Sequence, residues 1–214
     1  MPILTNYLEA LLPIVDINLN DTSPVLRQYH ISPFDIINLC GGIPSPETTS
    51  VRVIMNSTFS SALSVQIFTD QYEVVRNMDF QIGRIDNNFM LVRDQGKGFG
   101  TKLFLTQVQT ARQLNFKRLH TTALAPNDDL NWSGYYFWAD LGYENTDIEE
   151  YRAWATEMGR EEPTLSELVQ SESGRQLWKQ SGFTWIGNFY LTDDHPCMGY
   201  LRRHLERKGI DFVP

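Results

Sequence analysis

The clearest pattern along the chain is an alternation of apolar and polar side chains that begins at residue 51. The segments "VRVIMNSTF", "ALSVQIFTD" and "YEVVRNMDF" are also rich in β-branched and aromatic residues. This pattern predicts strands of one sheet over 51–59, 62–69 and 72–80. The next segment, "RIDNNFMLV" (84–92), predicts a further, buried strand that leads into a glycine-rich stretch.

After the glycine-rich stretch the apolar spacing changes to that of a helix. From Phe104 onward the apolar residues recur at spacings of four, three and three, which predicts a helix with one core face. A strand is predicted over 117–124. A second helix is predicted over "LNWSGYYFWADL", capped by Asp128 or Asp129 and ended by Gly142. The middle of the chain therefore has α/β or α+β organisation.

The two ends of the chain have different patterns. Residues 3–12 predict an amphipathic helix that stops near Pro13, and residues 18–50 read as loop-rich because "SP" recurs there. Near the other end, "TLSE" (164–167) is a capping-box pattern within a segment of helical character at about 145–182. A late strand is expected over 183–191.

The last segment, "DDHPCMGYLRRHLERKGI", predicts a final helix with an Asp cap, Pro196 in its first turn and Gly209 beyond its end. No linker-like segment separates residues 51 to 214, so we expect a single domain over 1–214. Its parts would be an N-terminal helix and loop-rich extension (1–50), a core (51–143), a helical insertion (144–182), and a late strand with a C-terminal helix (183–214).

Charge and composition exclude several classes of protein. The formal net charge of −8, with a pI near 5.0, argues against nucleic acid or an anionic membrane as the main partner. The two cysteines, Cys40 and Cys197, form no disulfide framework, and none of the four histidines falls in a metal-ligand pair, so we predict no metal. No apolar run approaches the roughly 20 residues of a membrane helix, and the start lacks the features of a signal peptide. A cytoplasmic protein is the expectation.

The stretch "RDQGKGFGTKLF" (93–104) carries the candidate chemistry, and three nucleotide motifs fail there on spacing. The G-x-x-x-x-G-K-[ST] loop is absent, because Thr101 and Lys102 follow Gly100 in the reverse order. The G-x-G-x-x-G fingerprint fails because its third glycine, counted from Gly96, falls on Thr101. The chain also lacks the "HRD" and "DFG" motifs of a kinase.

The pattern that fits is Q-x-x-G-x-G, with Gln95, Gly98 and Gly100 between a predicted strand and a predicted helix. A turn whose successive N–H groups point inward, followed by a helix N-terminus, makes a nest for an anion such as a pyrophosphate. Glycine is needed where a Cβ would block the anion or where φ must be positive.

The segment "QGKGFGTKLF" resembles the acetyl-CoA-binding segment of the GCN5-related N-acetyltransferase superfamily, whose signature is Q/R-x-x-G-x-G/A. A downstream helix of that family often reads N-x-x-A-x-x-x-Y-x-x-x-G-F. Here "NWSGYYFWADLGY" aligns with it without a gap: Asn131 matches the Asn, Gly134 the small residue, and Gly142 with Tyr143 the Gly-Phe pair. The resemblance covers about residues 51–143.

The resemblance implies an acyl-CoA N-acyltransferase-like fold, with a mixed, mostly antiparallel sheet flanked by helices and split where the cofactor enters. It also implies acetyl-CoA as the acyl donor. The residues implied to bind this cofactor are the motif residue Gln95, the pyrophosphate-binding amides of Gly96, Lys97, Gly98, Phe99, Gly100 and Thr101, the pantetheine-pairing strand end Met90, Leu91 and Val92, and Asn131 and Gly134 on the second helix.

The match departs from the family at the proton donor. In this superfamily an amine attacks the thioester directly, and a tyrosine hydroxyl commonly protonates the departing thiolate. The usual tyrosine position holds Trp138, which cannot donate a proton at ordinary pH, so Tyr135 and Tyr136 are the catalytic candidates. The candidate bases are Glu73, Asp79 and Asp86, with no ground for a choice among them.

The expected function is transfer of an acetyl group from acetyl-CoA to a primary amine of an unidentified acceptor, by direct attack in a ternary complex. An alternative is a catalytically weak or inactive module that binds acyl-CoA for sensing or protein interaction, which Trp138 favours. A third reading is transfer of another acyl group. The expected partners are acetyl-CoA and an amine-bearing acceptor; the oligomeric state is open, with a homodimer as one option.

Overall fold

A computed structural model describes residues 15–20, 23–43, 51–93, 96–125 and 134–211. Contacts between Cα atoms divide the chain into two compact units, residues 1–116 and 117–214. In both units the described strands form mostly antiparallel sheet and helices flank it, so the predicted α/β (α+β) fold class is confirmed. No helix in the described residues is long and apolar enough to cross a membrane.

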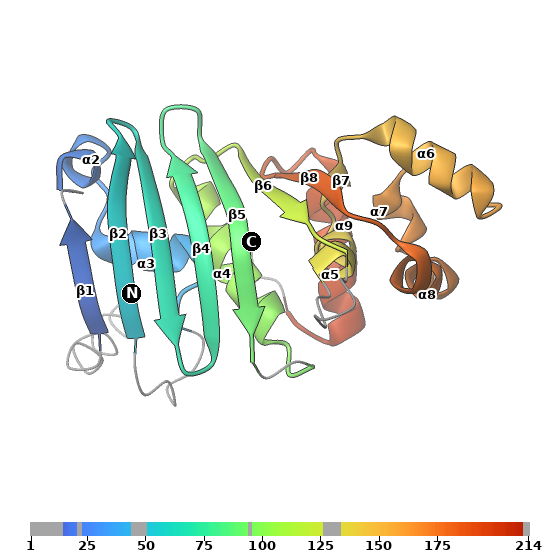
Figure 1. Cartoon of the computed structure of the whole chain (residues 1–214), viewed down its shortest axis with the longest axis horizontal. Coiled ribbons are helices and arrows are strands. Elements are labelled where there is room, and N and C mark those ends of the chain that lie inside the picture. Colours follow the sequence, from blue (N-terminus) through green and yellow to red (C-terminus); the bar gives the residue numbers. More distant parts are fainter. Residues whose placement is uncertain (1–14, 21–22, 44–50, 94–95, 126–133, 212–214) are drawn as a thin grey trace. The chain divides into compact units, whose positions relative to one another are not determined.

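The described residues of the first unit form five strands, which lie side by side in the order of the sequence (Figure 1). They are β1 (Val15–Asn20), β2 (Val51–Phe59), β3 (Ala62–Thr69), β4 (Tyr72–Asp79) and β5 (Arg84–Val92). The pairs β2–β3, β3–β4 and β4–β5 are antiparallel, whereas β1 pairs with β2 in parallel. The sequence predicts all four strands between residues 51 and 92, the first three of them from the alternation.

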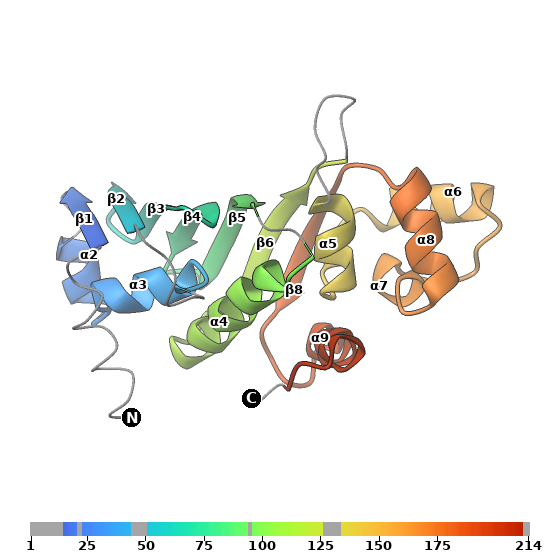
Figure 2. The same cartoon turned by 90° about the horizontal axis from the view of Figure 1, so that it is seen from below.

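Two helices, α3 (Pro33–Leu39) and α4 (Phe99–Gln113), lie on the same face of this sheet (Figure 2). Inward-facing side chains such as Val65 and Ile67 are fully buried. The chain leaves α3 through Gly41, whose φ of +116° favours glycine and whose added Cβ would come within 2.9 Å of the Leu103 side chain on α4. Glycine therefore lets the two helices approach closely.

The prediction that residues 18–50 are loop-rich is wrong. This segment holds part of β1, the helix α2 (Ser23–Gln28) and α3. The Ser32–Pro33 pair, one of the pairs on which the loop-rich prediction rests, starts a helix: the Ser32 side chain accepts from Asp35 N, and the Asp35 side chain accepts from Ser32 N. Because Ser-Pro serves both turns and helix starts, the dipeptide alone does not separate them.

The prediction that β5 is a buried strand is also wrong. Its inward positions Ile85 and Asn87 are buried, but Asn88 is exposed and Leu91 is 38% exposed. Its first half has one buried face, as in the neighbouring antiparallel strands, and burial falls away toward the glycine-rich loop.

The second unit has a smaller antiparallel sheet, ordered β6-β8-β7. Its strands are β6 (Arg118–Ala123), β7 (Glu144–Asn145) and β8 (Trp185–Tyr190), and its helices are α5 (Gly134–Asp140), α6 (Ile148–Glu157), α7 (Leu165–Leu168), α8 (Glu172–Ser181) and α9 (Pro196–Lys208). Helices α6, α7 and α8 occupy the segment that the sequence assigns to a helical insertion.

Hydrogen bonds from tryptophan indoles connect the elements of the second unit. The indole N–H groups of Trp178 and Trp185 both donate to the Tyr135 carbonyl, at 3.2 and 2.8 Å, and that of Trp154 donates to the Ser181 carbonyl at 2.9 Å. Trp178 and Trp185 are buried, so each polar indole edge has the acceptor that burial demands.

The ends of two helices follow the sequence signals, while one start does not. Gly142 (φ +100°) follows α5 and Gly209 (φ +64°) caps the C-terminus of α9, as predicted. The predicted Asp cap of the last helix is wrong, since His195 is the N-cap of α9. Pro196 occupies the first helical position, which assigns the residue before it to the cap and leaves Asp193 and Asp194 outside the helix.

Candidate functional site

The glycine-rich loop joins β5 to α4 within the first unit. Gly96 and Gly98 have φ values of +82° and +76°, the left-handed region that side chains rarely adopt. A Cβ added at either glycine meets no described heavy atom within 4 Å. The described parts of the chain thus leave the space beside both glycines open.

The start of α4 has no side-chain cap, unlike five other helix starts in the described residues. Its N-cap Gly98 has no side chain, and the Lys102 N–H donates to the Gly98 carbonyl at 3.1 Å as the first bond of the helical ladder. The first N–H groups of an α-helix have no acceptor within the helix, and at α4 the N-cap residue supplies no side-chain acceptor. By contrast, side chains cap the starts of α3, α6, α7, α8 and α9: Ser32, Asp147, Thr164, Ser171 and His195.

Electrostatics at this helix start favour an anion. A helix of 15 residues places about half a positive charge at its N-terminus. Lys97 lies in the loop, and the Lys102 ammonium lies 5.9 Å from the Phe99 ring centroid in the first turn. In a chain of net charge −8, the loop and helix start are locally cationic.

A β-bulge interrupts β5 two residues before the candidate segment Met90–Val92. The register passes from Val75↔Phe89 to Arg76↔Asn87, so Asn88 is an extra residue in β5. The buried Arg76 guanidinium donates to the Phe89 carbonyl at 2.5 Å and to the Val75 carbonyl at 3.0 Å. The bulge is thus held from inside the core. The sequence does not predict the bulge. The adjacent asparagines Asn87 and Asn88 are its one visible sign, because asparagine is uncommon inside strands.

A buried amide pair joins the bulged strand to α4. Asn87 Nδ2 donates to Gln107 Oε1 at 3.1 Å, and Gln107 Nε2 donates to Asn87 Oδ1 at 2.9 Å and to the Leu39 carbonyl at 2.8 Å. Asn87 is 3% and Gln107 1% exposed. Because each partner satisfies the other, the pair fixes β5, α4 and the end of α3 against one another. Two amides at core-facing positions could have signalled this contact.

The predicted pantetheine-binding strand end lies at the end of the first unit's sheet. Met90, Leu91 and Val92 pair with Val74, Glu73 and Tyr72 of β4. Among the described strands of residues 1–116, β5 pairs with β4 alone.

The candidate catalytic residues Tyr135 and Tyr136 lie on α5 with Gly134, in the second unit. The Tyr135 hydroxyl donates to the Lys179 carbonyl at 2.6 Å, and burial raises its pKa. The Tyr136 ring lies 4.3 Å from the Lys179 ammonium; burial, and next the Asp140 carboxylate, raise the pKa of Tyr136 to about 12. Trp138 is buried, 6% exposed. Gln95, Asn131 and the predicted caps Asp128 and Asp129 lie outside the described residues.

The three candidate bases have different surroundings. The Asp79 carboxylate accepts from the N–H groups of Gln81 and Ile82, at 3.0 and 3.2 Å. Asp86 pairs with Arg84 at 3.0 Å. Glu73 lies directly opposite Leu91 in the β4–β5 ladder, beside the strand end that the sequence assigns to the cofactor.

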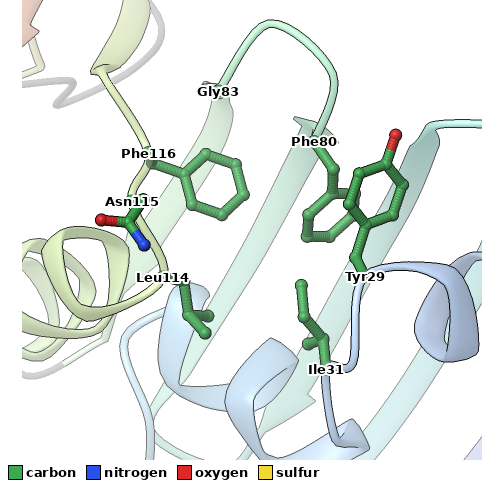
Figure 3. Close-up of a pocket in the computed structure, with 7 residues that line it drawn as sticks. All are labelled: Tyr29, Ile31, Phe80, Gly83, Leu114, Asn115 and Phe116. Atoms are coloured by element: carbon green, nitrogen blue, oxygen red, sulfur yellow. The ribbon is translucent and has the colours of Figure 1, made fainter.

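A small hollow lies near the C-terminal end of α4, opposite the glycine-rich loop (Figure 3). Its walls are Tyr29, Ile31, Phe80, Gly83, Leu114, Asn115 and Phe116. Tyr29 stacks on Phe80 at 5.1 Å between ring centroids, and Phe80 meets Phe116 edge-on at 5.3 Å. The side chains around the hollow cover the core at this end of the unit. None of the predicted site residues lines the hollow.

Comparison with known proteins gives little similarity in sequence. No family model and no curated protein matches the chain. Among solved structures it is similar to nourseothricin acetyltransferase, with 12% identity and a TM-score of 0.36, over 75% of this chain and 95% of that one. A similarity at this TM-score is too low to support a function, so the functional conclusion depends on the residues themselves.

Proposed function

We propose that this protein is an acetyltransferase that takes its acetyl group from acetyl-CoA and delivers it to a primary amine by direct attack. The observation that carries the proposal is the open glycine turn at the uncapped start of α4. The correspondence of the loop and of residues 131–143 to the two motifs of the N-acetyltransferase superfamily supports it.

The start of α4 offers what a pyrophosphate requires. Left-handed glycines turn the backbone, the first N–H groups of the helix lack acceptors within it, and Lys97 and Lys102 add positive charge. We assign the pyrophosphate to the amides of residues 96–101. The pantetheine arm would pair with the backbone of Met90–Val92, at the end of β5 that leads into the loop.

The bulge in β5 suits a second role in this proposal. A bulge leaves a backbone group outside the ladder and redirects it. An N–H group released at Asn88 would donate to the thioester carbonyl oxygen as negative charge develops there. Arg76 and the Asn87–Gln107 pair would hold that group in position from beneath.

The reaction requires two proton transfers. The acceptor ammonium loses a proton, its nitrogen forms a bond to the acetyl carbon, the carbon–sulfur bond breaks, and the thiolate of CoA takes up a proton. For the second role Tyr136 remains the candidate of the two tyrosines, because the Tyr135 hydroxyl already donates to a backbone carbonyl. Glu73 is assigned the first role because it lies beside Leu91, whereas Asp79 and Asp86 are bonded within their own hairpin.

A specific observation favours a second candidate, a module that binds acyl-CoA without efficient chemistry. Trp138 occupies the position of the family's tyrosine and is buried among aromatic rings, and the Tyr135 hydroxyl is engaged. In this reading the cofactor nest is retained while the proton donor is lost.

Calorimetric titration with acetyl-CoA tests the cofactor assignment in three proteins: the native chain, Gly98→Glu and Gly159→Glu. Gly159 is the matched control, since it also has a positive φ (+65°) and open space around an added Cβ, but lies after α6. We expect micromolar binding to the native chain and to Gly159→Glu, and none to Gly98→Glu. Equal binding by all three proteins would show that the pyrophosphate does not bind at the glycine-rich loop. No binding by the native chain would overturn the proposed function.

Mass spectrometry of a panel of primary amines incubated with acetyl-CoA and the protein separates the two candidates. A mass increase of one acetyl group on an amine, dependent on the protein, supports the enzyme. Tight acetyl-CoA binding with no acetylated amine in the panel supports the binding module.

A further inference from the structure

Three side chains of the second unit bring different metal-binding atoms together. They are Glu144 on β7, His195 at the N-cap of α9, and Cys197 in the first turn of that helix. A carboxylate oxygen, an imidazole nitrogen and the thiol sulfur of these residues all lie within 4.8 Å of one another. The fold makes this cluster by pairing β7 with β8, which leads directly into α9.

We propose that Glu144, His195 and Cys197 bind one transition-metal cation of the Zn²⁺ class. Thiolate and imidazole together select such a cation over Ca²⁺ and Mg²⁺, which prefer oxygen ligands. Three protein ligands leave one position of a tetrahedral site to water. The three proposed ligands belong to the second unit and share no residue with the acetyl-CoA nest.

The present contacts of these three groups are long. His195 Nδ1 lies 3.5 Å from Cys197 N and 3.7 Å from the nearer Glu144 oxygen, and Cys197 Sγ lies 4.0 Å from the Asn188 carbonyl. Strong N–H···O bonds measure about 2.7–3.2 Å. A cation at the centre would replace loose contacts with coordinate bonds of about 2.0–2.3 Å.

The cluster combines a fixed ligand with two adjustable ones. Cys197 is fully buried, whereas the Glu144 and His195 side chains are 34% and 27% exposed. The two partly exposed side chains can close around an ion that enters from their side. The buried thiol would anchor it.

Outer groups orient the proposed ligands. The His195 ring lies on Tyr190, with 4.3 Å between ring centroids. Asn188 pairs with Glu144 in the β7–β8 ladder, and its side chain contacts His120 Nδ1 at 3.0 Å. The Tyr190 ring limits how the His195 imidazole can turn, and the β7–β8 ladder fixes the backbone of Glu144.

Binding must displace a proton. An ordinary cysteine thiol, with a pKa of about 8.5, is mostly protonated at neutral pH. A coordinated sulfur is a thiolate. Loading the site at neutral pH would therefore release about one proton per ion from Cys197.

The sequence predicts no metal, and the reason lies in the spacing. His195 and Cys197 are two residues apart, and Glu144 precedes them by about fifty positions, which matches no zinc-binding pattern. Only the pairing of β7 with β8 brings the acidic residue to the other two.

Titration of the purified full chain with Co²⁺ tests the site, because cobalt reports its ligands by absorption. We expect a thiolate charge-transfer band, strong visible bands of a four-coordinate ion, and displacement of both by Zn²⁺. Cys197→Ala should abolish the charge-transfer band, while His195→Gln and Glu144→Gln should each weaken affinity at least roughly 100-fold. The matched controls Cys40→Ala and His30→Asn, both in the first unit, should bind as the native chain does.

Calorimetry of Zn²⁺ binding in buffers of different ionisation enthalpy should show about one proton released. A native chain without a thiolate band, or Cys197→Ala binding as tightly as native, would overturn the proposal. If Cys197→Ala loses its circular dichroism signature, the partly exposed His195 and Glu144 variants decide in its place. No readout uses acetyl-CoA, so failure here is distinct from failure of the proposed acetyl transfer.

Discussion

The starts of α4 and α8 show two ways of treating the same backbone groups. At α8 the Ser171 hydroxyl accepts from Gly174 N at 3.0 Å, and Arg175 pairs with Glu172 in the first turn. At α4, which is longer, Gly98 supplies neither a side chain nor a charge. A side-chain cap contributes about 0.5–2 kcal/mol, and the chain forgoes it at α4.

The difference shows where the chain keeps polar groups available. The start of α8 is complete without a ligand. At the start of α4 the N-cap residue supplies no side-chain acceptor. Under the proposed function, the start of α8 contributes stability and the start of α4 contributes binding.

The largest expected effect comes from giving α4 a cap of its own. Gly98→Asp places a carboxylate at the helix start, where it would accept the first-turn N–H groups and repel the pyrophosphate by several kcal/mol. We expect acetyl-CoA affinity, measured by calorimetry, to fall at least about 100-fold, or roughly 2.7 kcal/mol.

Gly98→Asn separates charge from size in that experiment. Asparagine tolerates a positive φ and has the shape of aspartate without its charge. We expect its affinity to lie between those of the native chain and Gly98→Asp. An aspartate variant that binds acetyl-CoA as tightly as the native chain would show that the α4 start holds no anion.

A smaller effect is expected at the start of α8. Ser171→Ala removes the hydroxyl that accepts from Gly174 N and should lower the free energy of unfolding by about 1 kcal/mol, or Tm by roughly 2–4 °C. Thermal unfolding monitored by circular dichroism measures this. Acetyl-CoA affinity should be unchanged, and a parallel loss of affinity would contradict the division of roles between the two helix starts.

The Tyr135 hydroxyl of the second unit already has a hydrogen-bond acceptor. Tyr135→Phe removes the hydrogen bond to the Lys179 carbonyl, which should cost about 0.5–1.5 kcal/mol of unfolding free energy. Denaturant unfolding measures that loss. The rate of acetyl transfer at saturating acetyl-CoA should stay within about twofold of native, and a larger fall would return Tyr135 to the catalytic candidates.

The sequence predicts the parts of the fold that depend on local periodicity. Alternation predicts the strands from 51 to 80, and the spacing after Phe104 predicts the buried face of α4. It fails where structure depends on pairing between distant segments. The parallel contact of β1 with β2 and the bulge at Asn88 follow from strand register, which no local pattern specifies.

The candidate site divides in the same way. Gly96 and Gly98 are visible in the sequence because glycine marks special backbone conformations, and their positive φ values bear out that expectation. Asn87 and Gln107, twenty residues apart, become partners only when β5 and α4 pack together. Likewise, Glu144 meets His195 and Cys197 only through the edge of a sheet.

The smallest expected effect concerns the second tyrosine of α5 and the pH dependence of stability. Tyr136 has a pKa raised to about 12 by burial and by the Asp140 carboxylate, above its value of about 10 in an unfolded chain. Its neutral form therefore contributes stability that is present in full below pH 10 and lost as the pH rises toward 12. In Tyr136→Phe the free energy of unfolding should fall less between pH 10 and pH 12 than in the native chain. Between pH 6 and 9 its dependence on pH should be the same in both proteins. Denaturant midpoints across this range measure both, and an identical alkaline loss in the variant would show that the Tyr136 hydroxyl titrates as in the unfolded chain.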